Sequence, residues 1–297
     1  MSQFKRGIRK PGMMEALAEL AARESWWADV LKDKTLIIGV RDDYLNVYWR
    51  GQSLFKVEMN NGRVVATTHP KYLLDPDLSG QVVLDGNTGA FALDGLDALT
   101  RNYRPGETLN KLKRAANLFT KEEKEGVQAI VNANANVVDV EVAFPAVAGS
   151  RNVPRIDIAT FSEDGEAVRL VFWEAKVLAN PELRPSGDKN VVTQINAYAD
   201  LLAQHAQGVL ESYKVISRNL VAFALMSNGA RTLAPAIQNV ADGADLTLAT
   251  PADVRLVVFG FDAAQRDLIW KPLLAPLEER LGTGRILARG EPSGIRL

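Results

Sequence analysis

The chain has 297 residues, of which 47% are hydrophobic and 24% are charged, and these proportions exclude a disordered, collagen-like or disulfide-rich protein. Cysteine is absent and only two histidines, His69 and His205, are present, so any metal ion should be a hard cation bound by carboxylates, such as Mg²⁺ or Mn²⁺. The net charge of -1 provides no overall field to attract a polyanion, so any nucleic-acid binding must be local.

The start of the chain lacks the features of a secretory signal. The basic residues within 1–12 are not followed by an apolar run. No segment reaches the roughly 18 uninterrupted apolar residues of a membrane span. We therefore expect a cytoplasmic protein without a membrane partner.

The first part of the chain, residues 1–106, is predicted to be a helix followed by antiparallel strands. Apolar residues recur at helical spacing over 13–31, which predicts one amphipathic helix. Short apolar runs over 35–68 are separated by Asp, Asn and Gly, which predicts a β-meander. Residues 69–106 are rich in Gly, Asp and Pro and predict a connection to a second domain, 107–297.

Aromatic and basic residues in this region allow two interpretations. Tyr48, Trp49 and Arg50 lie in one predicted strand and could stack on a base, although aromatic residues in short strands more commonly pack in a core or across strands. Two basic clusters could bind nucleic acid or simply be solvated: Lys5, Arg6, Arg9 and Lys10, and then Arg101, Arg104, Lys111, Lys113 and Arg114.

The second part of the chain is predicted to have an α/β fold. Helical patterns over 108–134 predict two helices that meet near residue 119, where Thr120 and Glu123 have the spacing of a capping box. The pattern then predicts three strands, two helices, a strand and a helix bent by Pro272 and Pro276. The strands are expected over 137–144, 155–161, 168–178 and 255–261, and the helices over 191–205, 209–227 and 263–281. The expected fold class is a mixed sheet flanked by helices.

Charged residues interrupt two of these apolar strands. Period-two alternation places Glu174 and Lys176 on one face of a strand that is otherwise apolar, and the preceding strand would bring Asp157 beside Glu174. Two neighbouring carboxylates repel unless a divalent cation lies between them. Such a cation polarises a phosphoryl oxygen and activates water, while Lys176 could orient that water or neutralise developing charge. This chemistry suits phosphodiester hydrolysis. A structural ion pair of Glu174 with Lys176 or Arg155 is the alternative.

The following loop and helix carry further polar candidates. Gln194 and Tyr198 are four residues apart and share one helix face, so both could reach the same site. Tyr198 taken alone is more commonly a core tyrosine with a satisfied hydroxyl. Arg184 and Lys189 lie in the preceding loop and could contact substrate phosphate or be solvated.

Asp157, the segment Glu174-Ala175-Lys176 and the pair Gln194 and Tyr198, in this order, resemble the PD-(D/E)xK nuclease superfamily. The likeness is greatest to its RecB-like branch with the QxxxY motif, and the order of elements over 109–261 is similar to the family's restriction-endonuclease-like core. Ile156 stands where the family has proline, and the interval after the QxxxY helix is longer than in a minimal core.

The resemblance implies a role for each of these residues. Asp157 and Glu174 would bind Mg²⁺ or Mn²⁺, Lys176 would assist the attacking water, and Gln194 and Tyr198 would position the nucleic-acid strand or the lysine. A glutamate on the family's first helix often completes the site. The candidates for it are Glu122, Glu123, Glu125 and, on the first strand, Glu141.

The sequence therefore predicts a metal-dependent nuclease that acts on nucleic acid, with DNA favoured, and leaves open whether it is a homo-oligomer. One alternative is a catalytically inactive module of the same fold that binds nucleic acid or serves as a scaffold. Another is a structural protein that assembles through its β-meander.

Overall fold

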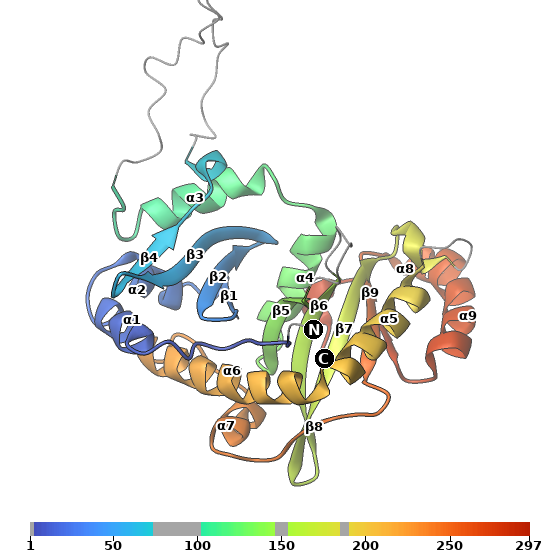
Figure 1. Cartoon of the computed structure of the whole chain (residues 1–297). Helices are drawn as coiled ribbons and strands as arrows, with labels where there is room; N and C mark the ends of the chain where they lie inside the picture. The colour runs from blue at the N-terminus through green and yellow to red at the C-terminus, as the bar shows by residue number, and fades with distance from the viewer. Residues whose placement is uncertain (1–2, 74–101, 146–153, 185–189) are drawn as a thin grey trace, which may run out of the picture.

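The computed structural model describes residues 3–73, 102–145, 154–184 and 190–297, which form an α/β fold with two sheets (Figure 1). The predicted β-meander is confirmed, because four antiparallel strands follow one another in chain order. These strands are β1 (Ile37–Val40), β2 (Tyr44–Trp49), β3 (Gln52–Asn60) and β4 (Arg63–Thr67).

The single helix predicted over 13–31 is wrong, because two helices, α1 (Met13–Ala21) and α2 (Trp26–Lys32), occupy this segment. Ser25 begins the second helix, since its hydroxyl accepts a hydrogen bond from the backbone N–H of Ala28 at 3.1 Å. A serine at this position offers the backbone an alternative to continuing the first helix, which the apolar spacing alone does not reveal.

The second sheet is mixed and has six strands. The strands β5 (Val137–Ala143), β6 (Arg155–Asp164) and β7 (Ala167–Val177) pair antiparallel, close to the predicted ranges. Two strands then pair parallel with β7 at successive positions along it, β8 (Leu246–Leu248) and β9 (Val254–Phe259), and β10 (Ile286–Ala288) pairs parallel with β9. Apolar alternation predicts β9 but not the three-residue strands β8 and β10, which are too short to show a period.

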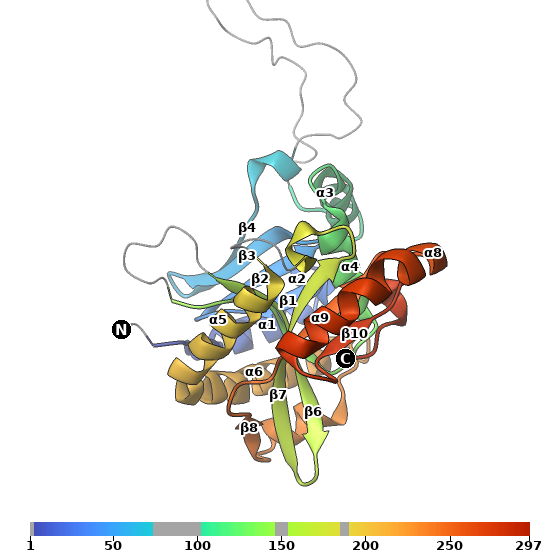
Figure 2. The same cartoon turned by 90° about the vertical axis from the view of Figure 1, so that its right-hand side faces the viewer.

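Helices cover both faces of the mixed sheet. The helices α3 (Thr108–Asn117) and α4 (Glu122–Asn132) meet where predicted, but the capping box does not form, since the Thr120 hydroxyl donates to Glu125 instead. The helices α5 (Val191–Gln204), α6 (Ala206–Met226) and α7 (Pro235–Ala241) follow β7. The predicted last helix is divided into α8 (Ala263–Gln265), a π-helical turn (Arg266–Trp270) and α9 (Lys271–Leu281). In Figure 2, α5 and α9 lie side by side in front of the sheet.

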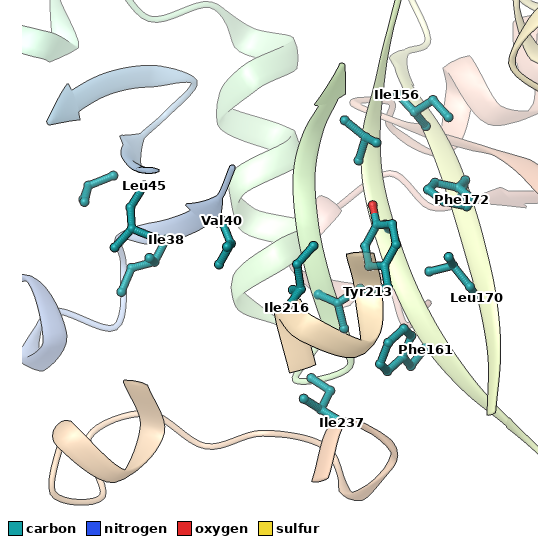
Figure 3. Packing of buried hydrophobic residues seen from close by; sticks show 14 of the residues in the cluster. Ile38, Val40, Leu45, Ile156, Phe161, Leu170, Phe172, Tyr213, Ile216 and Ile237 are labelled. Carbon is teal, nitrogen blue, oxygen red and sulfur yellow. The ribbon is translucent and has the colours of Figure 1, made fainter. Parts of the chain in front are cut away.

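The sheet separates two hydrophobic clusters. On one face, Phe161, Leu170 and Phe172 of the sheet pack against Tyr213 and Ile216 of α6 (Figure 3). On the other, α4 packs against β6, β7 and β9. The first cluster continues into α1, α2 and the meander, and α6 contacts both parts of the chain (Figure 1). The two parts therefore share a core, and the domain boundary after residue 106 stays a prediction.

Buried charges also join the two parts. Arg6 and Arg41 form salt bridges to the two oxygens of Asp139 on β5, with N–O distances of 2.6 and 2.7 Å. Arg6 therefore does not belong to the basic surface cluster near the N-terminus, because its side chain is buried. Near the other end of α6, the Arg231 guanidinium donates to the backbone oxygens of Val30 and Leu31, carbonyls that the end of α2 leaves unpaired.

The described residues also contain three short 3₁₀ helices, η1 (Pro70–Tyr72), η2 (Pro181–Leu183) and η4 (Pro292–Gly294). Within the described ranges, no helix is both long enough and apolar enough to cross a membrane.

Candidate active site

Asp157 lies where β6 and β7 separate. The strands are paired residue by residue as far as Ile158 and Trp173, so the next position along brings Asp157 across from Glu174. The ladder is not continued there by backbone pairs. Instead, Oδ2 of Asp157 accepts a hydrogen bond from the backbone N–H of Ala175 at 3.0 Å. The Asp157 carboxylate therefore lies at the opening between the two strands.

Among the described residues, only one of the two oxygens of the buried Glu174 carboxylate has a partner. Its Oε1 lies 2.7 Å from the Lys176 ammonium, whereas its Oε2 is buried and has no hydrogen-bond partner among the described residues. Burial, and after it the negative charge of Asp157, raises the pKa of Glu174 well above its ordinary value. Binding a proton or a cation would stabilise a buried carboxylate of this kind.

Lys176 is held between two acidic side chains. Its ammonium lies 2.7 Å from Glu174 and 2.7 Å from Glu182 of η2, and its side chain is only 6% exposed. Burial by itself would lower the pKa of Lys176, but the charge and hydrogen bond of Glu174 outweigh it, so the net shift is upward. The lysine is therefore a fixed positive charge at the C-terminal end of β7.

A second lysine, Lys124 at the start of α4, reaches the Asp157 carboxylate from the helix that packs on the other face of the sheet. Its ammonium lies 2.9 Å from Oδ1 of Asp157 and 2.7 Å from Oε1 of Glu141. Burial opposes its charge, but Asp157 and Glu141 outweigh this, and the pKa of Lys124 is raised. The sequence analysis did not identify Lys124, because a lysine in the polar first turn of a helix carries no distinguishing pattern.

The structure separates the four glutamates that were candidates to complete the site. Glu141 shares Lys124 with Asp157, and its backbone has a φ of 51°. Glu123 instead accepts a hydrogen bond from Asn180, and Glu125 pairs with Arg50. Glu122 has no contact with Asp157 or Lys124 among the described interactions. Glu141 is thus the candidate that the fold connects to Asp157.

Gln194 and Tyr198 form the predicted pair on one face of α5. The Gln194 amide donates to the Tyr198 hydroxyl at 2.7 Å, and this hydroxyl donates to the backbone oxygen of Arg155, also at 2.7 Å. Burial, followed by the charge of Glu174, raises the pKa of Tyr198. Oε1 of Gln194 is buried without a partner in the described part of the chain. The pair therefore anchors β6 two residues before Asp157.

The sequence predicts that Arg184 and Lys189 bind substrate phosphate, and the structure describes only Arg184. Arg184 follows η2, and its guanidinium donates to the backbone oxygen of Asn180 at 3.0 Å. Lys189 lies outside the described residues, as does Arg101 of the second basic cluster. The remaining residues of that cluster, Arg104, Lys111, Lys113 and Arg114, lie on or beside α3.

The acidic groups at this site are few. Among the residues that the structure describes, no three His, Asp or Glu side chains are arranged to hold a metal ion together. A cation bound here would use the pair Asp157 and Glu174. Neither a family model nor a curated protein nor a solved structure matches the chain.

Proposed function

We propose that the protein is a metal-dependent nuclease of the PD-(D/E)xK type that hydrolyses phosphodiester bonds in nucleic acid, with DNA favoured. The observation that carries this proposal is the buried carboxylate pair Asp157 and Glu174. One oxygen of Glu174 has no partner among the described residues, and Lys176 is held beside it. Buried charge of this kind costs free energy and is expected where chemistry requires it.

The order of elements supports the same proposal. The segments α4, β5, β6, β7, α5 and β9 follow one another as in a restriction-endonuclease-like core, with additional helices between α5 and β9. The strand β9 lies parallel beside β7, so that Glu174 and Lys176 are on a central strand with neighbours on both sides. The candidate residues thus occupy rigid elements, which hold reactive groups more precisely than loops do.

A Mg²⁺ or Mn²⁺ ion fits the residues present, because two carboxylates lie together and Oε2 of Glu174 lacks a partner in the part of the chain that the structure describes. Asp157 and Glu174 would hold it. Magnesium commonly uses one or two carboxylates together with water and substrate phosphate, so a third acidic side chain is not required. When bound, such an ion polarises a phosphoryl oxygen and lowers the pKa of coordinated water.

The lysines supply positive charge on both sides of the carboxylate pair. Lys176, which remains charged beside Glu174 and Glu182, can donate a hydrogen bond to the attacking water or neutralise the charge that develops on the phosphate. The Lys124 side chain is 30% exposed and can donate to a phosphate oxygen. Tyr198 holds the backbone of Arg155 and so positions Asp157.

One observation favours the alternative, a catalytically inactive module of the same fold. Both oxygens of Asp157 already have partners, since Lys124 binds one and the backbone of Ala175 binds the other. Lys124 thus pairs with Asp157 and Lys176 with Glu174, as they would in a structural network of ion pairs. A cation would have to displace or share these contacts, and metal binding therefore distinguishes the two functions.

The proposal is tested by incubating the full chain with single-stranded DNA, duplex DNA and RNA in Mn²⁺, with EDTA as a control. We expect cleavage that EDTA stops and that the double variant Asp157→Asn/Glu174→Gln abolishes. Asp164→Asn is the matched control, because this exposed carboxylate lies at the opposite end of β6 and pairs with Arg169. It should cleave as the unchanged protein does.

Calorimetric titration with Mn²⁺ gives an independent readout. The unchanged protein and Asp164→Asn should bind the ion, and the double variant should not. If no substrate is cleaved and no variant differs in Mn²⁺ binding, the nuclease proposal is wrong and the inactive module is favoured.

A further inference from the structure

A group of aromatic and basic side chains lies on the N-terminal part of the fold, where the meander meets α3. It consists of Trp49 and Arg50 at the end of β2, Lys71 in η1, Lys113 in α3 and Phe119 directly after α3, and is called the aromatic-basic surface below. In Figure 1, α3 runs along the edge of the meander and leads into α4. The surface therefore connects the meander to the helix that carries Lys124.

The rings and the cations of this surface alternate. The Lys71 ammonium lies 4.4 Å from the centre of the Phe119 ring, and the Lys113 ammonium lies 4.0 Å from the centre of the Trp49 ring. The Arg50 guanidinium lies 5.1 Å from the same Trp49 ring. Phe119 is 41% exposed, and its neighbour Leu118 is 69% exposed. Trp49 is partly buried and Lys113 pairs with Asp33 at 2.8 Å, so the exposed Phe119 ring beside Lys71 is the part of the surface suited to a base and a phosphate.

Hydrogen bonds hold the rings in place. The Trp49 indole N–H donates to Oδ1 of Asn117 at 2.8 Å. The Gln52 amide donates to the backbone oxygen of Phe119 at 2.9 Å, and its oxygen accepts from Lys71 at 3.1 Å. These bonds join β2, β3 and η1 to the end of α3. A fixed platform loses less conformational entropy on binding than mobile side chains would.

The surface ends at the candidate active site. Gly51, the residue after Arg50, has a φ of 75°, and a Cβ placed on it would lie 2.7 Å from Cβ of Lys124. Arg50 forms a salt bridge of 3.2 Å with Glu125 on the same turn of α4. Lys124 in turn lies 2.9 Å from Asp157. Consecutive contacts thus lead from the Trp49 ring to the Asp157 carboxylate.

We propose that the aromatic-basic surface binds single-stranded nucleic acid and leads it to Asp157 and Glu174, an inference that rests on the proposed nuclease function. An unpaired base can stack on the exposed Phe119 ring, whereas the bases of a duplex are already stacked and cannot. Lys71 has no carboxylate within salt-bridge distance among the described residues, so its charge is available to a phosphate. Because the whole chain has a net charge of -1, this local surface is what would attract the polyanion.

The test measures binding by fluorescence anisotropy of labelled single-stranded DNA, single-stranded RNA and a DNA duplex, in EDTA so that no strand is cut. We expect Phe119→Leu, which keeps apolar volume but removes the ring, to weaken single-strand binding at least about fivefold. Phe119→Tyr should restore it to within about twofold, because it returns an aromatic face. Lys71→Gln should weaken binding and reduce its dependence on salt.

Two control variants lie on α6, away from this surface. Leu225→Ala truncates an apolar side chain that is 74% exposed, and Lys214→Gln removes an exposed charge. Both should bind as the unchanged protein does. The inference is overturned if Phe119→Leu and Lys71→Gln bind the single strand as tightly as these controls, or if the duplex binds as tightly as the single strand.

The two proposals fail in different ways. If the single strand binds in EDTA and Phe119→Leu weakens it, but no strand is cut in Mn²⁺, the surface stands and the nuclease function falls. If strands are cut in Mn²⁺ and Phe119→Leu alters neither binding nor cleavage, the nuclease function stands and the surface falls.

Discussion

Replacing Asp139 by Asn should destabilise the fold severely. The Asp139 side chain is completely buried and accepts from Arg6 at 2.6 Å and from Arg41 at 2.7 Å. An amide of the same shape has no charge to balance two buried guanidinium groups, and its NH₂ group faces further donors. Breaking a buried ion pair by removing one partner costs about 3–5 kcal/mol.

The loss is moderated but not cancelled by the remaining partners. Arg41 also donates to the backbone oxygens of Val40 and Val140, at 2.9 and 2.8 Å, so its guanidinium stays hydrogen-bonded. These carbonyls carry no net charge, and two like charges are left close together. Since typical stabilities are about 5–15 kcal/mol, the expected cost is about a fifth of the total or more.

Urea unfolding followed by circular dichroism measures this cost. With a slope of about 3 kcal/mol per molar, the midpoint of Asp139→Asn should fall by about 1 M or more. The control is Asp42→Asn, because the Lys5–Asp42 pair is 3.7 Å apart with both side chains about half exposed, and such pairs contribute about 0–1 kcal/mol. An Asp139→Asn cost below about 1 kcal/mol would refute the argument that this charge cluster holds the two parts of the chain together.

Three further predictions test the core, the site and the ion pairs. Leu170→Ala should cost about 2–5 kcal/mol of unfolding free energy, because this side chain is fully buried, whereas the exposed Leu225→Ala should cost less than about 0.5 kcal/mol in the same urea experiment. Tyr198→Phe should lower the unfolding free energy by about 1–3 kcal/mol and reduce cleavage, because it removes the hydroxyl that donates to the Arg155 carbonyl of β6. Unchanged stability and unchanged cleavage would show that this hydroxyl does not position β6. Burial opposes the charge of Asp33, but hydrogen bonds, foremost the one with Lys113, outweigh burial and lower the pKa of Asp33. The stability that the Asp33 carboxylate provides is therefore complete above about pH 5 and is lost as the pH falls below about 4. The difference in thermal midpoint between the unchanged protein and Asp33→Asn should shrink over that range and not grow.

The sequence alone was sufficient for features that depend on local period. Alternation identified β5, β6 and β7 and put Glu174 and Lys176 on an apolar strand, because side chains of a strand alternate regardless of what covers them. The same reasoning predicted that Asp157 would lie beside Glu174, since consecutive antiparallel strands pair with their neighbours. The i and i+4 spacing placed Gln194 and Tyr198 on one helix face.

Features that depend on contacts between distant segments were decided only by the tertiary structure. Lys124 approaches Asp157 from 33 positions away in sequence, and nothing in its local sequence indicates that contact. The link between Glu141 and Asp157 through Lys124 depends on how α4 packs over β6 and β7. Arg6 lies in a basic stretch and its local sequence does not distinguish it, whereas the fold buries it against Asp139, 133 positions away. Local patterns are fixed by backbone geometry, whereas these partners are selected by the shape and charge of the completed core, which no short window of sequence contains.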